Sequence, residues 1–171
     1  MSLVVSKIIY AEVVNRFKRE LERTHHLDIK ANNIIGFIGI LTGIVSGFGA
    51  FTLKIPTTDL EMVTLAIYGS SLIFLFLSLV FGMKAHFPQK FTIVPDPYFL
   101  IDKYGNATQQ KTINDLSDNY AVAVEENLIL NNSKIKNIKR SMYCLFIAIL
   151  LFSIFAGFFA LNPQKVTEVI L

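Results

Sequence analysis

The sequence predicts an all-α integral membrane protein: three transmembrane helices, an amphipathic N-terminal helix, and a long cytoplasmic helix that continues into the third span. Hydrophobic residues make up 53% of the 171 residues and charged residues 17%, with a mean hydropathy of +0.50. This composition is unusual for a soluble domain. The apolar residues also gather into three runs, 34–53, 62–83 and 142–161, which contain no Asp, Glu, Lys, Arg or His.

Each run is long enough to cross a bilayer as a helix, since about 20 residues at about 1.5 Å per residue span the hydrocarbon layer. A soluble helical bundle would need a polar face on each helix. None of the three runs has one. We therefore expect a single membrane domain over residues 1–171.

The positions of the basic residues predict the orientation, because short cytoplasmic flanks are enriched in Lys and Arg. Six precede the first run, eight lie between the second and third, and two lie elsewhere. This distribution predicts a protein of the inner (cytoplasmic) membrane, with cytoplasmic segments at 1–30 and 84–140 and an external tail at 162–171. About thirty residues precede the first span, far more than the n-region of a signal peptide.

The first cytoplasmic segment predicts an amphipathic helix over 2–24 that runs into the first span. Apolar residues recur there at steps of three and four, namely Tyr10, Val13, Phe17 and Leu21. Charged residues lie opposite, namely Glu12, Arg16, Arg19, Glu20 and Arg23. This basic face fits either a solvated surface near anionic headgroups or a ligand site.

The second cytoplasmic segment starts with an irregular stretch, 87–106, which contains three prolines and a Tyr104-Gly105-Asn106 turn signal. Residues 91–94 could form a short strand there. One helix over 112–161, about 75 Å long at the standard rise, is expected beyond it. Its apolar stripe has Asn131 as the single polar interruption and comprises Ile113, Leu116, Tyr120, Val124, Leu128, Ile135, Ile138 and Met142. The stripe needs a partner, which is either the N-terminal helix or the same helix of a neighbouring subunit.

Chemical motifs are absent from the sequence. It has no nucleophile and base at motif spacing, no phosphate-binding glycine loop and no Cys or His cluster, so we expect no catalysis, metal or cofactor. Basic residues that already fit the positive-inside pattern give no case for nucleic acid. The spans also lack the ionisable groups that coupled transporters place there, which argues against transport.

Small residues recur within the spans at helical spacing. Gly39, Gly43 and Gly47 follow each other at steps of four in the first run, and Ser153 and Gly157 do so in the third. Because lipid is as apolar as leucine, helices in membranes associate where small side chains allow close backbone approach. These faces predict helix packing, either within one protomer or between protomers.

Two segments resemble a known family. The sequence Leu27-Asp28-Ile29-Lys30-Ala31-Asn32 enters a glycine-rich span like the Asp-x-Lys-Ala entry of membrane effectors in nucleotide-signalled antiviral defence. The helix from Glu126 and Asn127 through Asn131, Lys134 and Lys139 runs directly into a final span. This layout resembles the Pycsar transmembrane effectors and the SLATT-like domains associated with nucleotidyltransferase and SLOG systems.

The resemblance implies that a cyclic nucleotide or related signal triggers assembly or opening of the membrane part and collapses the membrane barrier. No nucleotide-binding domain is recognisable, so a partner protein is one route for the signal. If a nucleotide binds directly, its phosphate and base are expected near Arg16, Arg19, Arg23, Asp28 and Lys30, or near Asp96 and Tyr98. The alternative function is that of a non-catalytic accessory subunit of a larger membrane complex.

Overall fold

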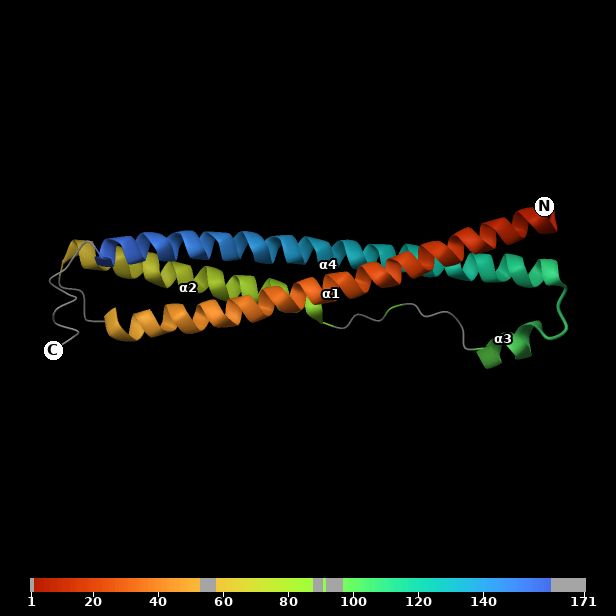
Figure 1. Ribbon diagram of the computed structural model, residues 1–171, viewed down its shortest axis with the longest axis horizontal. Coiled ribbons are helices and arrows are strands. Elements are labelled where there is room, and N and C mark those ends of the chain that lie inside the picture. Colours follow the sequence, from red (N-terminus) through yellow and green to blue (C-terminus); the bar gives the residue numbers. More distant parts are fainter. Residues whose placement is uncertain (1, 53–57, 88–90, 92–96, 161–171) are drawn as a thin grey trace. The chain divides into compact units, whose positions relative to one another are not determined.

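The computed structural model describes residues 2–52, 58–87, 91 and 97–160, and in this part of the chain every regular element is an α-helix. The helices are α1 (Leu3–Thr52), α2 (Asp59–His86), α3 (Pro97–Tyr104) and α4 (Gln109–Ala160) (Figure 1). Helices α1, α2 and α4 are long and apolar enough to cross a membrane. The predicted fold class is therefore confirmed, while the limits of the spans at 34–53, 62–83 and 142–161 stay predictions.

The helix ends follow from local sequence. Thr58 and Glu61 form a capping box at the start of α2, with the Glu61 amide 3.3 Å from the Thr58 hydroxyl and the Thr58 amide 3.4 Å from the Glu61 carboxylate. Helices α1 and α4 contain no proline, and α1 carries the predicted N-terminal helix into the first span without a break. The predicted continuity of the long second helix is confirmed as well.

The expectation of an irregular stretch over 87–106 is wrong at 97–104, where the chain forms α3. Proline is tolerated at the first position of a helix because the amide that it lacks has no intrahelical partner there. The predicted turn follows α3, with the Ala107 amide 3.0 Å from the Tyr104 carbonyl oxygen. The predicted strand at 91–94 lies outside the described residues, except for Phe91, which is in neither a helix nor a strand.

The chain divides into two compact units. Unit 1 comprises Met1–Ile29 and Phe87–Ile135, and unit 2 comprises Lys30–His86 and Lys136–Leu171. In unit 1, the contacts Phe17 to Tyr120 and Thr24 to Asn131 advance together along α1 and α4. These helix segments therefore lie side by side and run in the same direction.

The inward-facing residues of unit 1 follow a heptad pattern, in which steps of three and four alternate. In α1 the buried and half-buried members are Ser6, Tyr10, Val13, Phe17, Glu20, Thr24 and Leu27. In α4 they are Ser117, Tyr120, Val124, Asn127, Asn131 and Lys134. The partner of the α4 stripe, which the sequence left open, is thus the N-terminal helix of the same chain.

The apolar stripe predicted for α4 is wrong in part. Asn131 is not its only polar member, since Asn127 and Lys134 are buried beside it. Leu128 and Met142, which were assigned to the stripe, are exposed, as is Leu21 of the predicted α1 stripe. Successive steps of four rotate by about 40° each around a helix with 3.6 residues per turn, so a run of such steps leaves the packed face.

Unit 2 packs α2 against the C-terminal parts of α1 and α4, with α2 antiparallel to both. Its core comprises Ile38, Val45, Tyr68, Leu75, Ala148 and Phe155. The Tyr68 hydroxyl donates a hydrogen bond to the Val45 carbonyl oxygen at 3.1 Å. Ser78 and Ser141 each donate to the other's carbonyl oxygen, at 2.8 and 2.7 Å. These buried polar contacts are the kind that join helices in lipid.

Candidate functional site

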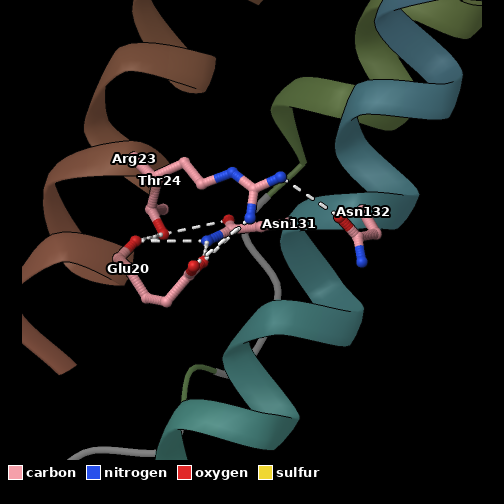
Figure 2. Close-up of polar contacts among 5 residues, drawn as sticks. All are labelled: Glu20, Arg23, Thr24, Asn131 and Asn132. Atoms are coloured by element: carbon pink, nitrogen blue, oxygen red, sulfur yellow. Dashed lines mark hydrogen bonds and ion pairs between the residues drawn. The ribbon is translucent and has the colours of Figure 1, made fainter. Parts of the chain in front are cut away.

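The candidate site is a buried polar network in unit 1, centred on Asn131 of α4 (Figure 2). The Asn131 amide nitrogen donates to the Glu20 carbonyl oxygen at 3.1 Å and to the Glu20 carboxylate at 2.8 Å. The Asn131 amide oxygen lies 3.0 Å from the Thr24 hydroxyl. Arg23 binds the Glu20 carboxylate at 3.2 Å and the Asn132 side chain at 3.2 Å. Burial of these polar groups is tolerated because they satisfy each other.

A buried ion pair lies one turn further along α4. The Lys134 side chain is 2% exposed, and its ammonium is 2.5 Å from the Asp28 carboxylate, whose side chain is 37% exposed. The same ammonium is 5.1 Å from the centre of the Phe91 ring, within reach of a cation–π contact. Lys134 is therefore held by α1 and by the segment that follows α2.

At the far end of unit 1, Tyr120 of α4 packs edge-on against the rings of Tyr10 and Phe17, with ring centres 5.9 and 5.3 Å away. Burial, and then the neighbouring Tyr10, raise the pKa of the Tyr120 phenol above its ordinary value. Gln110 also donates to the Ser6 hydroxyl. Polar and aromatic contacts thus line much of the α1–α4 interface.

This arrangement is suited to holding two helices in register. Buried polar residues at heptad core positions fix the alignment of packed helices. Among the described residues, no group of three or more His, Cys, Asp or Glu side chains could hold a metal ion. The network consists of hydrogen bonds and ion pairs, all of which water could replace if the helices separated.

Three of the seven predicted ligand residues are already engaged with other side chains. Arg16 pairs with Glu12 at 3.1 Å, and Arg23 and Asp28 belong to the contacts described above. Arg19 is exposed in unit 1, and Lys30 is exposed in unit 2.

The remaining two predicted ligand residues belong to the connector. Tyr98 is exposed on α3, whereas Asp96 lies outside the described residues. The predicted ligand set therefore stays a prediction.

Sequence reasoning missed Thr24 and the burial of Glu20, Asn127 and Lys134. All four lie on the 3–4 repeat of their helices, so a search for polar residues at heptad core positions would have found them.

A groove of about 500 Å³ also runs between α1 and α4 in unit 1. Its lining is mainly apolar and includes three charged residues; the lining residues are Ile8, Ile9, Glu12, Val13, Arg16, Ala121, Val124, Glu125 and Leu128. Because an apolar lining offers few hydrogen bonds to phosphate or ribose, the groove fits an apolar surface better than a nucleotide.

The small-residue faces of the spans divide into two kinds. A methyl group added at Gly39, Gly43, Gly47 or Gly157 would meet no atom within 4 Å among the described residues, and Ser153 is exposed. At Gly82, by contrast, it would lie 3.2 Å from Ile35 and 3.4 Å from Ser141. Close packing within unit 2 therefore uses Gly82 and leaves the predicted glycine face of the first span open.

Comparison with known proteins gives one match. A family model described as the Pycsar effector protein domain matches residues 12–161. No curated protein and no solved structure matches the chain.

Proposed function

Because the chain belongs to the Pycsar effector family, whose members are membrane effectors in nucleotide-signalled antiviral defence, we propose that it oligomerises in the inner membrane and permeabilises it. A nucleotide signal or a partner protein triggers this change. In this proposal the protein catalyses no reaction, and its assembled helices themselves perturb the membrane. Its N-terminus and unit 1 lie in the cytoplasm, where the signal is made, and its C-terminus is external.

The open glycine face of the first span is the observation that supports assembly. Gly39, Gly43 and Gly47 lie on an apolar helix, and no other side chain of the described residues covers them. Small-residue faces of this kind let helices of neighbouring protomers approach closely in lipid. At most 22% of the apolar window of each span is buried, so much of its surface remains for neighbours and lipid.

Permeabilisation is tested by inducible expression in cells that also make the signalling nucleotide, with a dye that reports membrane potential. The expected result is depolarisation that depends on the signal. An intact potential at full expression would contradict the proposal. Recovery of stoichiometric unrelated subunits in mild detergent, without a homo-oligomer, would instead favour an accessory subunit.

The glycine face is tested with Gly43→Ile. Since a Cβ added at this position meets nothing within 4 Å among the described residues, the variant should insert and fold but lose most of its assembly and depolarisation. Ala66→Ile, which adds similar bulk to an exposed position of α2, is the matched control and should behave as wild type. Equal activity of the two variants would exclude the glycine face from the mechanism.

A further inference from the structure

The groove in unit 1 is an apolar surface in a segment that we place in the cytoplasm. Its wall residues Ile8, Ile9 and Leu128 are exposed, although each lies on a helix with charged neighbours. A contiguous exposed patch of this kind on an otherwise charged surface marks an interaction site. Its lining combines six apolar residues with three charged ones, Glu12, Arg16 and Glu125, and protein interfaces likewise combine an apolar core with polar residues.

We propose that the same groove of a second copy of this chain fills it, so that two copies of unit 1 form a parallel four-helix bundle. This inference rests on the proposed oligomerisation and names the cytoplasmic surface that carries it. Copies inserted in one membrane share one orientation, so their α1 and α4 segments run parallel. A two-fold axis parallel to the helices then brings α1 of one copy against α4 of the other. Each residue faces residues of the other copy that lie at the same depth, which is the distance from the membrane along the helix axis.

One pair of opposite charges, Arg19 and Glu125, fits this symmetry. Along unit 1, contacting residues of α1 and α4 are separated by 103 to 111 positions, and Asp28 and Lys134 by 106. Arg19 and Glu125 have the same separation, 125 − 19 = 106, and therefore lie at the same depth. Glu125 lines the groove, and Arg19 lies one turn beyond Arg16 on the α1 edge.

The two-fold arrangement pairs Arg19 of each copy with Glu125 of the other. The same separation places Glu12 at the level of Asp118 of the other copy, and Arg16 neutralises Glu12 within its own helix. Membrane anchoring raises the local concentration of the copies, so an interface smaller than that of a soluble dimer suffices.

Cysteine cross-linking tests the pairing in vesicles of bacterial lipid, using full-length chains in which Cys144 is replaced by serine. One set of chains carries Arg19→Cys and another carries Glu125→Cys, with different tags. Disulfide-linked dimers are expected when both sets are reconstituted together, and not when either set is alone. Cross-linking in both single-variant samples would overturn the two-fold pairing.

Charge reversal provides a second test. Arg19→Glu and Glu125→Arg should each lower the dimer association constant roughly tenfold, because each replaces two ion pairs by like charges. The double variant should recover wild-type association. Failure of this rescue would contradict the Arg19–Glu125 contact.

The apolar part of the groove is tested by Leu128→Gln, with Leu21→Gln as the matched control. The two side chains are similarly exposed, at 39% and 42%, but only Leu128 lines the groove. Only Leu128→Gln should weaken association, while helix content stays unchanged in both. If wild-type protein is oligomeric but none of these variants changes it, this interface is wrong and the proposed function stands. If wild-type protein stays monomeric with the signal present, oligomerisation itself fails.

Discussion

Replacing Asp28 with asparagine removes the carboxylate that compensates the Lys134 ammonium. The amine stays buried, because its side chain is 2% exposed and is enclosed by α1, α4 and Phe91. Breaking a buried pair from one side typically costs about 3–5 kcal/mol, since the remaining charge loses its partner and has little water. The opposite change, Lys134→Met, removes the charge and keeps a side chain of similar length. It should be neutral or stabilising.

The structure lowers the expected cost of Asp28→Asn. The Asp28 side chain is 37% exposed, so water can approach the ammonium from that side. The Phe91 ring, 5.1 Å away, also retains part of the stabilisation. We therefore expect the free energy that keeps α1 and α4 together in unit 1 to fall by about 2–3 kcal/mol. This corresponds to a roughly 30- to 160-fold increase in the equilibrium constant for local opening of the two helices.

Amide hydrogen exchange in lipid nanodiscs measures this local stability directly. The amides of residues 20–28 and 127–135 should exchange faster by that factor in Asp28→Asn, whereas Lys134→Met should protect them as well as wild type does. The double variant should resemble Lys134→Met, because no charge is left unpaired. Equal exchange in Asp28→Asn and wild type, or equal damage from both single variants, would refute the reasoning.

Three further predictions concern other contacts. Gly49→Ala places a methyl group 1.9 Å from the Tyr68 hydroxyl oxygen, so it should lower the free energy of unfolding, measured by heating in detergent, by about 1–3 kcal/mol. Gly47→Ala is the control and should leave this free energy unchanged. Ser141→Ala removes one of the two reciprocal hydrogen bonds with Ser78 and should lower the free energy of unfolding by about 0.6–1.7 kcal/mol in the same assay. An unchanged free energy of unfolding would contradict a role of this contact in helix packing. Because the pKa of Tyr120 is raised, the folded state favours the protonated phenol. This contribution to stability is complete below the ordinary value of 10.0 and is lost as the pH rises through the raised value. Circular dichroism should therefore show less alkaline loss of helix in Tyr120→Phe than in wild type.

The membrane helices could be predicted from sequence because their signal is local. A run without charges, such as 62–83, is long enough for lipid whatever it packs against. The continuity of α1 and α4 was predictable for the same reason, since no proline or turn signal interrupts either helix.

The interior of unit 1 could not be predicted in the same way, because a helical period of apolar residues does not mark polar side chains that are buried. Asn131 and Lys134 are buried with partners on a distant part of the chain, and a sequence does not reveal those partners. Tertiary contacts thus decide which face of an amphipathic helix is covered. Helix α3 was missed because Pro97 was interpreted as a helix breaker, although it occupies the first position of the helix.

The amides and the ammonium between α1 and α4 also determine how unit 1 responds when its helices part. A leucine interior that opens exposes hydrocarbon to water, and the resulting surface aggregates or closes again. Asn131 and Lys134 would instead become hydrated, since water offers an amide and an ammonium new hydrogen-bond partners. The interior of unit 1 therefore tolerates wetting, and the helix pair can separate and re-form without passing through an insoluble state.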